Sequence, residues 1–435
     1  MKNPENKKVL IVGGGFGGLN AAKALIGKPV SVTLIDRKNY HTFQPLLYQV
    51  ATAVLSPGQI AQPLRRILYK AKNVKIILGE VSGFDLKTKH AICREGARLK
   101  YDYLIVSTGA RHAYFGNNEW EKDAPGLKTI EDALEIRRRI LLVFELAERE
   151  ACLTGKHKPI HFAIIGGGPT GVELAGSIAN IASRSLAKDF KCIDMTKCRI
   201  TLYEGASQIL GVYPERLSKK AEKQLRELGV EICKNSLVMG IEPGRINVRN
   251  EWIPVSLALW STGIEASPLG KALGAKTERT GRVMIEPDLS IASHPEVFVI
   301  GDMSFLLNSS GLPIPALGAP AIQQGRTAAE NILRDINEKP RITFRYRDMG
   351  SMATIGRHRA VAEIGSWRFS GYIAWFIWAI VHIVMLMGFR HRLAVFYEWV
   401  WTYFTRERSA RLITGDIDHL LMRMQKNTGK VKRKS

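Results

Sequence analysis

The sequence predicts an α/β protein with two Rossmann-like dinucleotide-binding domains and a C-terminal helical membrane-docking region. An apolar run, a glycine-rich turn and a helix of small residues occur in that order twice, about 150 residues apart, and predict the paired domains. Near the C-terminus, residues 369–389 contain no Lys, Arg, Asp or Glu, which predicts the last region. The chain has 435 residues, whereas one domain typically has about 100–200, so several domains are expected.

The first glycine-rich turn lies in KKVLIVGGGFGGLNAAKAL, with its fingerprint glycines at Gly13, Gly15 and Gly18. In this motif the glycines permit a tight turn, close approach of a pyrophosphate and close helix–strand packing, and the helix N-terminus favours the phosphate charge. The following strand, VSVTLID, ends at Asp36, where a carboxylate can accept hydrogen bonds from a ribose. Together, the turn, the helix and the acid predict a dinucleotide site.

Two later strand ends indicate which dinucleotide binds there. YDYLIVSTGA ends with Thr108 and Gly109, and EVFVIGDMS contains Gly301 and Asp302. In flavoproteins with two dinucleotide domains, a strand ending in Gly-Asp brings an acid to the ribityl and phosphate portion of FAD. A helix cap is the alternative role for Asp302. We therefore predict FAD at the first turn, with further contacts from Phe16, Gly17, Arg37, Gln44 and Val81.

The second glycine-rich turn, in IHFAIIGGGPTGVELAGSIA, repeats the fingerprint at Gly166, Gly168 and Gly171. Its partner strand, RITLYEG, ends at Glu204, where a carboxylate would accept ribose hydroxyls and repel a 2′-phosphate. No Arg or Lys follows in EGASQIL, so we predict NADH rather than NADPH. A later strand end, LWSTGIEASP, points toward the same nucleotide with Thr262 and Gly263.

Glu173 lies in the first turn of the helix that follows the second fingerprint. One interpretation is a catalytic residue that orients substrates or relays protons. The other is a surface carboxylate that the positive end of the helix dipole favours.

The composition describes a folded, basic protein. There are 63 Lys and Arg against 40 Asp and Glu, a net charge of +23, so an anionic partner is expected. No nucleic-acid-binding motif is present, which favours anionic lipid over nucleic acid. The five cysteines are scattered and odd in number, so we predict ordinary thiols, no disulfide and a reducing compartment. We also expect no metal site and no secretory signal.

Cysteine placement separates the possible flavoenzymes. A disulfide reductase would carry a redox cysteine pair in the segment after Asp36, but NYHTFQPLLYQVATAVLSP contains none. Sulfide-oxidising quinone reductases also need catalytic cysteines near the flavin. The chain instead resembles type II NADH:quinone oxidoreductases, the single-subunit NADH dehydrogenases that do not pump protons. The resemblance covers nearly the whole chain, through GGGFGG, FQPLLYQVATAVLSP, GGGPTGVELAG, VIGDM, PAIQQGRTAAENI, GSMATIGRHRAVAEIG and RSARLITGD.

The resemblance implies that FAD takes a hydride from NADH and passes electrons to a membrane quinone. It also implies quinone contacts from Gln323 and Gln324, which match the later part of the family's two-glutamine motif, while Ala319 stands where the first glutamine often occurs. A hydrogen bond at the helix start is the alternative role for Gln323. A homodimer is possible. The predicted domains are 1–120 and 286–340 for FAD, 121–285 for NADH with a linking helix, and 341–435 for membrane association.

The uncharged run 369–389 could reach about 30 Å as a helix, just enough to span a bilayer. The next segment, RLAVFYEWVWTYFT, is dense in aromatic residues and suits the membrane interface. Residues 390–435 hold 11 basic and 4 acidic residues, and a single span would place them outside, against the positive-inside rule. We therefore predict helices that lie in the cytoplasmic leaflet of the plasma membrane, with the tail on anionic lipid.

Two other functions fit parts of the sequence. A soluble NAD(P)H:ferredoxin-type flavoprotein reductase would share both dinucleotide turns without needing the apolar segment. A non-enzymatic flavoprotein that senses NADH on nucleic acid would use the basic charge and predicts salt-sensitive DNA binding.

Overall fold

The computed structural model describes residues 6–185, 189–405, 408 and 410–415, and it divides into two compact units. The first unit comprises Met1–Thr42, Ala61–Arg111 and Ile264–Met349. The second comprises Phe43–Ile60, His112–Gly263 and Gly350–Ser435. Each glycine-rich turn falls in its own unit.

The first unit is built on a six-stranded sheet in the order β20-β21-β9-β1-β2-β5. All its neighbouring strands are parallel except the edge pair β20 and β21, which is antiparallel. The central strands read as unbroken apolar runs, as expected for parallel strands covered on both faces. The strands are β20 (Ser290–Ile291), β21 (His294–Val299), β9 (Tyr103–Val106), β1 (Lys7–Val12), β2 (Val30–Asp36) and β5 (Val74–Leu78).

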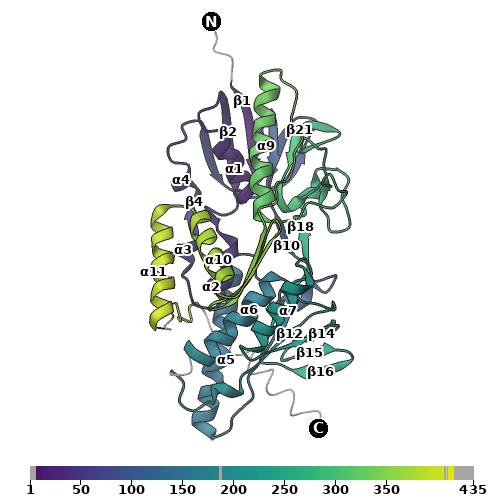
Figure 1. The fold of residues 1–435 in the computed structure, drawn as a ribbon. Coiled ribbons are helices and arrows are strands. Elements are labelled where there is room, and N and C mark those ends of the chain that lie inside the picture. The colour runs from purple at the N-terminus through teal and green to yellow at the C-terminus, as the bar shows by residue number, and fades with distance from the viewer. Residues whose placement is uncertain (1–5, 186–188, 406–407, 409, 416–435) are drawn as a thin grey trace. The chain divides into compact units, whose positions relative to one another are not determined.

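Two helices of this unit, α1 (Phe16–Ala24) and α9 (Gly318–Ile336), lie side by side (Figure 1). They touch closely because glycines face each other at the contact. A Cβ on Gly325 would lie 2.2 Å from the carbonyl oxygen of Gly17, so only glycine fits there. Other elements of this unit are β3 (Tyr40–Thr42), β4 (Ala61–Pro63), α4 (Leu64–Ile67), β6 (Val81–Asp85), β7 (His90–Cys93), β8 (Arg98–Lys100), β18 (Ile264–Ala266), α8 (Leu269–Ala272), β19 (Val283–Met284) and β22 (Ser304–Phe305). The strand β10 (Ala110–His112) begins in the first unit and ends in the second.

The second unit has its own parallel sheet, in the order β13-β12-β11-β17. These strands are β13 (Val230–Cys233), β12 (Arg199–Tyr203), β11 (His161–Ile165) and β17 (Leu257–Trp260). An antiparallel sheet adds β14 (Val238–Glu242), β15 (Arg245–Val248) and β16 (Glu251–Pro254). Its helices include α2 (Leu47–Ala51), α3 (Pro57–Ile60), α5 (Ile130–Thr154), α6 (Pro169–Asn180) and α7 (Glu215–Arg226).

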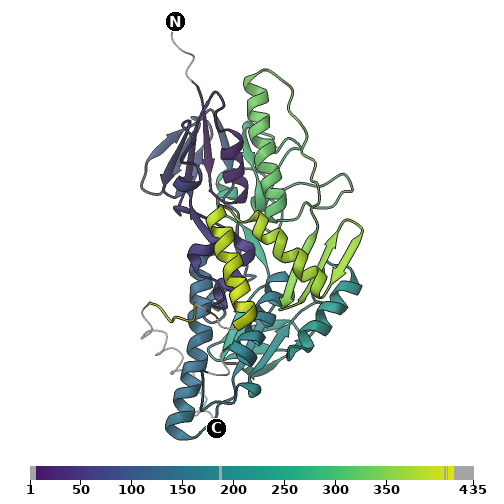
Figure 2. The same cartoon turned by 60° about the vertical axis from the view of Figure 1, so that its left-hand side comes forward.

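The C-terminal part of this unit begins with the antiparallel sheet β23 (Ser351–Gly356), β24 (Arg359–Ile364) and β25 (Trp367–Ser370). Two helices follow, α10 (Tyr372–Met385) and α11 (Phe389–Thr405), drawn in yellow-green in Figure 2. The uncharged run 369–389 is therefore divided between β25, α10 and the start of α11. Within the described residues, the structure contains no helix with both the length and the apolar character needed to cross a membrane.

Candidate functional site

The first glycine-rich turn connects β1 to α1 and has the geometry that the motif predicts. Gly13 has a φ of +102°, and a Cβ there would lie 2.5 Å from the carbonyl oxygen of Ser107. A Cβ on Gly18 would lie 1.9 Å from the Gly13 carbonyl oxygen, so this position in the first turn of α1 must be glycine. Gly15, in contrast, has nothing within 4 Å of its Cβ position. The turn is therefore tight on its protein side and open at the N-terminus of α1, which leaves room for the pyrophosphate that the motif predicts.

Asp36 braces this turn from the end of β2. One carboxylate oxygen accepts the backbone N–H of Gly14 at 2.5 Å, and the other accepts the N–H of Lys38 at 2.7 Å. Burial raises the pKa of Asp36, and these hydrogen bonds oppose that shift. Buried His41 adds a bond between Nδ1 and the Gly14 carbonyl oxygen at 3.0 Å. The predicted ribose acid thus also shapes the loop.

The Gly-Asp strand end is held by Gln324. Gly301 has a φ of +73°, and its N–H donates to Gln324 Oε1 at 2.6 Å. The Ser304 hydroxyl donates to the same oxygen at 3.2 Å. Beside it, the Thr108 hydroxyl and N–H both face Met303 Sδ, at 2.8 and 3.3 Å. These contacts fix the backbone on which Asp302 sits.

The two glutamines predicted at the quinone are engaged inside the first unit. Gln324 is 2% exposed, and its side-chain carbonyl oxygen accepts the two hydrogen bonds from Gly301 and Ser304. Gln323 bonds the backbone of Arg347 through both ends of its amide, donating at 2.9 Å and accepting at 3.0 Å. Both side chains have structural partners, so their contact with a quinone stays a prediction.

The second turn, between β11 and α6, has the same glycine geometry and the same type of hydrogen bonds as the first. Gly166 has a φ of +107°, a Cβ on Gly171 would lie 1.9 Å from the Gly166 carbonyl oxygen, and Gly168 faces open space. Glu204 accepts the N–H of Gly167 at 2.6 Å and that of Ala206 at 2.7 Å. Glu204 is therefore the counterpart of the ribose acid in the first unit.

A serine completes each turn, and the sequence reading missed both. Ser107 Oγ donates to the carbonyl oxygens of Val12 and Gly13. Ser261 Oγ donates to those of Ile165 and Gly166 in the same way. In the sequence each serine follows an apolar strand and directly precedes one of the Thr-Gly pairs that we predicted to bind a cofactor. That shared Ser-Thr-Gly triplet was the available signal.

The remaining predicted cofactor residues are dispersed. Thr262 lies against Gly166, since a Cβ on that glycine would be 2.7 Å from Thr262 Cβ. Gly263 has a φ of +72° at the end of β17. In the first unit, Phe16 and Gly17 lie in the first turn of α1, Gly109 has a φ of +70°, Arg37 is exposed and Val81 is buried at the start of β6. Gln44 is exposed and belongs to the second unit.

A cavity of about 160 Å³ lies within the second unit and is walled by α2, α6, β23, α10 and α11. Glu173 of α6 lines it, together with Tyr48 of α2. The prediction that Glu173 lies in the first turn of this helix is wrong, because α6 begins at Pro169 and its first turn contains no acidic residue. Burial raises the pKa of Glu173 to about 8, and a hydrogen bond with the Thr354 backbone opposes the shift only in part. Glu173 is therefore a neutral carboxylic acid at pH 7, and it can donate a proton. Aromatic side chains form most of the opposite wall: Trp375, Trp378, Trp399 and Tyr403.

Arg408 also lines this cavity and connects two of its walls by hydrogen bonds. Its guanidinium donates to the Thr52 carbonyl oxygen at 2.5 Å and to that of Ser177 at 3.4 Å. Ser177 Oγ in turn donates to Thr52 Oγ1 at 2.7 Å. Burial lowers the pKa of Arg408 to about 9. The arginine thus joins the end of α2 to α6, one helical turn from Tyr48 and Glu173.

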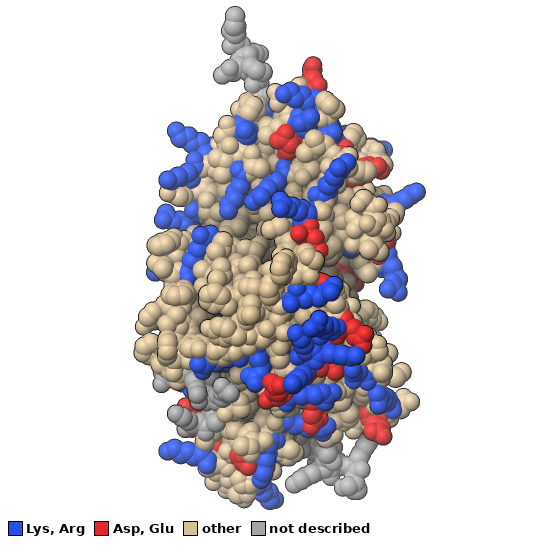
Figure 3. Space-filling view, in the orientation of Figure 1, with Lys and Arg blue, Asp and Glu red and all other residues tan. Residues whose placement is uncertain are grey.

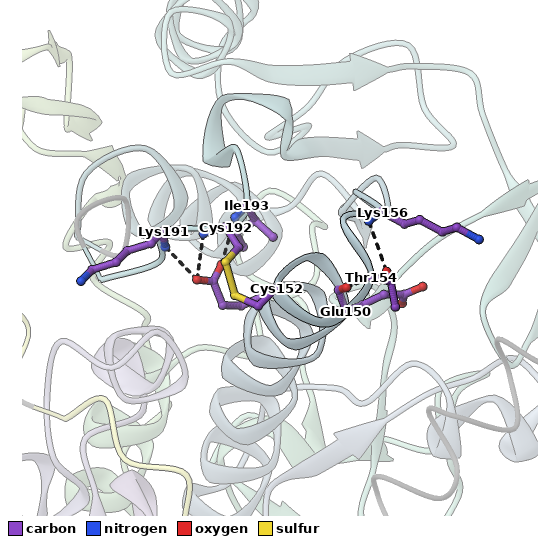
Figure 4. The surroundings of a disulfide bond; sticks show 8 residues. Glu150, Cys152, Thr154, Lys156, Lys191, Cys192 and Ile193 are labelled. Atoms are coloured by element: carbon purple, nitrogen blue, oxygen red, sulfur yellow. Dashed lines mark hydrogen bonds between the residues drawn. A yellow bond between two sulfur atoms is a disulfide. The ribbon is translucent and has the colours of Figure 1, made fainter.

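The prediction that all five cysteines are ordinary thiols is wrong for two of them. Cys152, at the end of α5, forms a disulfide with Cys192 (Figure 4). The Glu148 carboxylate accepts the backbone N–H groups of residues 191, 192 and 193, at 2.8, 2.9 and 3.0 Å. These bonds hold residues 191–193 against α5, a proximity that a spacing of 40 residues does not reveal. Cys93, Cys198 and Cys233 are free.

Comparison with known proteins identifies the chain. Residues 7–325 match the family "Pyridine nucleotide-disulphide oxidoreductase", and residues 349–407 match the "NDH2 C-terminal domain". The paired dinucleotide units define a protein of the first family, and the chain belongs to it. More narrowly, the chain belongs to the type II NADH:quinone oxidoreductases, since it is 41% identical to two such enzymes of Mycobacterium tuberculosis, NdhA and Ndh. Each alignment covers 94% of this chain, and 90% and 91% of the relatives.

A solved structure agrees on the fold. The structure of NDH2 from Plasmodium falciparum in complex with NADH matches with a TM-score of 0.84, at 21% identity, over 94% of this chain and 100% of that one. The predicted fold class and family resemblance are therefore confirmed. Enzymes of this family are FAD-dependent, associate with membranes from one side, oxidise NADH and reduce quinone without pumping protons.

Proposed function

We propose that this chain oxidises NADH through FAD and passes the electrons to a membrane quinone, without pumping protons. The observation that carries the proposal is the duplicated turn, with an acid-braced glycine loop in each unit, in a chain 41% identical to type II NADH:quinone oxidoreductases. When bound, FAD accepts a hydride and releases two electrons, and the protein supplies binding, orientation and protons.

Steady-state NADH oxidation by the purified protein, with and without a short-chain quinone, tests this function. We expect flavin absorbance in the protein and NADH consumption that depends on the quinone. A protein that reduces a ferredoxin but no quinone would support the soluble reductase instead. A protein with no turnover but salt-sensitive DNA binding would support the sensor.

We further propose that each glycine-rich turn binds a different dinucleotide. We assign FAD to the first turn, with Gly13, Gly15 and Gly18 around the pyrophosphate, Asp36 at the ribose and Asp302 near the ribityl and phosphate portion. We assign NADH to the second turn, with Glu204 at its ribose. The domain limits of 1–120 and 286–340 for FAD, 121–285 for NADH and 341–435 for membrane association belong to this proposal.

Glu173 is the candidate proton source for quinone reduction. Two protons must reach the quinone for each pair of electrons. A carboxylic acid with a pKa of about 8 is protonated at neutral pH and releases its proton readily, which suits a general acid. Its place in the wall of a cavity with aromatic sides supports this role.

The outer faces of α10 and α11 support docking on a membrane. Figure 3 shows a broad area over these helices with few charged side chains. An apolar surface of this extent typically marks a membrane or protein contact. The exposed apolar residues are Tyr372, Ile373, Phe376, Ile380, Val384, Met385, Phe389, Leu393, Phe396, Tyr397, Val400, Trp401 and Phe404, and we call this set the docking face.

We infer that the docking face rests on the cytoplasmic leaflet and that basic residues meet anionic lipid around it. Most of the basic tail, residues 416–435, lies outside the described residues. The side is tested with a protease tag after Ser435, which we expect to be cleaved only from the cytoplasm. We also propose that the protein forms a homodimer, and light scattering in detergent tests this.

A further inference from the structure

A chain of hydrogen bonds runs from α11 to α2 beside the cavity of the second unit. Trp399 Nε1 donates to Gln49 Oε1 at 2.8 Å, and Gln49 Nε2 donates to Tyr48 Oη at 2.8 Å. An indole nitrogen can only donate, so the end of the Gln49 amide that faces it must be the oxygen. The amide nitrogen then has to face Tyr48. The tryptophan therefore sets the direction of the whole chain.

The direction decides what the Tyr48 hydroxyl can do. Its oxygen already accepts the bond from Gln49, so its own hydrogen points elsewhere. Burial raises the pKa of Tyr48 well above its ordinary value of 10.0, which keeps the hydroxyl neutral. Within the part of the chain that the structure describes, Gln49 is the only side chain that bonds this hydroxyl, and Gln49 is the donor. Tyr48 is 6% exposed and lines the cavity, which thus contains a buried O–H without a protein acceptor.

Such a donor suits a ligand that only accepts. A quinone head group is flat and aromatic, and its two carbonyl oxygens accept hydrogen bonds but donate none. The cavity offers aromatic walls for the ring and two neutral O–H groups for the oxygens, from Tyr48 and from Glu173. In the first unit, the amide oxygens of Gln323 and Gln324 and the amide nitrogen of Gln323 are already bonded.

We propose that the Tyr48 hydroxyl donates a hydrogen bond to a carbonyl oxygen of a quinone bound in this cavity. Gln49 and Trp399 are positioning residues that orient the hydroxyl hydrogen of Tyr48. The inference rests on the proposed function. It adds the residue that recognises the acceptor and the two residues that orient it. The hydrogen bonds of Arg408 support the arrangement, because they hold α2 against α6 one helical turn away from Tyr48.

Kinetics of the flavin-loaded, full-length enzyme with two acceptors test the proposal. At saturating NADH, the acceptors are a short-chain benzoquinone and ferricyanide, which takes electrons without an aimed donor. Tyr48→Phe should raise the KM for the quinone about 3- to 10-fold, the value of one hydrogen bond, and leave ferricyanide reduction unchanged. Gln49→Glu keeps the shape but offers acceptors to both Trp399 and Tyr48. Tyr48 then donates to the new carboxylate, and the quinone KM should rise to a similar extent.

A double variant, Tyr48→Phe with Gln49→Glu, distinguishes loss of the hydroxyl orientation from a general disturbance of the cavity. If Gln49 acts through the tyrosine hydroxyl, Gln49→Glu should add nothing in the Tyr48→Phe background. Trp399→Phe should raise the quinone KM in the same way, whereas Trp252→Phe, on the exposed edge of β16, should leave it unchanged. Should Trp399→Phe lose ferricyanide activity by unfolding, Gln49→Glu carries the test alone.

Two results overturn the inference: an unchanged quinone KM in Tyr48→Phe, or a Gln49→Glu effect that persists without the hydroxyl. A wild-type enzyme that reduces ferricyanide but never quinone would overturn the proposed function instead.

Discussion

Glu173, in the second unit, couples the stability of the fold to pH. The pKa of Glu173 is raised from 4.5 to about 8, so the folded protein holds a proton that the unfolded chain would release. This group therefore costs stability as pH rises from about 4.5 to 8, and the cost levels off above that range. If Glu173 is the general acid that we propose, that acid is lost as pH rises through about 8.

We predict that quinone reduction by the wild type falls as pH rises through about 8. Glu173→Gln should lower kcat at pH 7 about 100-fold, the typical contribution of a general acid, and should lose that alkaline limb. A pH profile of kcat with a short-chain quinone measures both effects. Glu215→Gln, at an exposed site on α7, serves as the control and should keep the wild-type profile. Equal profiles for wild type and Glu173→Gln would remove the residue from the mechanism.

Glu204 should determine which nicotinamide dinucleotide the enzyme prefers. Its negative charge at the strand end should repel a 2′-phosphate, so Glu204→Gln should raise the ratio of kcat/KM for NADPH to that for NADH about 10-fold. Glutamine keeps the length of the side chain and one acceptor for the loop N–H groups, so the turn should persist. Steady-state kinetics with both nucleotides give the ratio. Equal use of NADPH and NADH by the wild type would contradict the assignment.

At the scale of elements, α6 and β23 meet at a contact that admits no side chain. A Cβ on Gly176 would lie 1.7 Å from the Ile355 carbonyl oxygen. Gly176→Ala must therefore push the strand away from the helix, at a cost of about 2 kcal/mol or more. A thermal melt should show the loss of stability. Gly58→Ala is the matched control, because nothing lies within 4 Å of that Cβ position in α3, and its melting temperature should not fall.

Local patterns predicted the elements well and their mutual contacts poorly. The two turns were predictable because a glycine fingerprint, a strand and a terminal acid are contiguous in the sequence. The partners of Gln323 and Gln324 were not, since the backbone of residue 347 and the 301–304 turn reach them only in the fold. The Cys152–Cys192 bond and the Trp399–Gln49 pair join residues 40 and 350 positions apart, and no periodicity signals such contacts.

For the whole molecule, the docking face should decide where the enzyme works. Replacing Phe396 and Val400 by Asp should greatly reduce cosedimentation with anionic phospholipid vesicles, because charge is costly to bury among lipid chains. Ferricyanide reduction should stay intact, while reduction of a long-chain, lipid-embedded quinone should fall steeply. Leu153→Asp, on exposed α5, is the control and should still bind vesicles. Deleting residues from Gly371 onward should also release the protein, and a truncated protein that stays with membranes would contradict docking.

The same apolar face governs how the purified protein behaves in water. Large exposed apolar areas tend to be covered, and without lipid or detergent the available cover is another molecule of the same kind. Samples prepared without amphiphile should therefore grow in apparent size with concentration and shrink when detergent is added. A dimer observed only under those conditions would report the solvent, not the arrangement of the enzyme on its membrane.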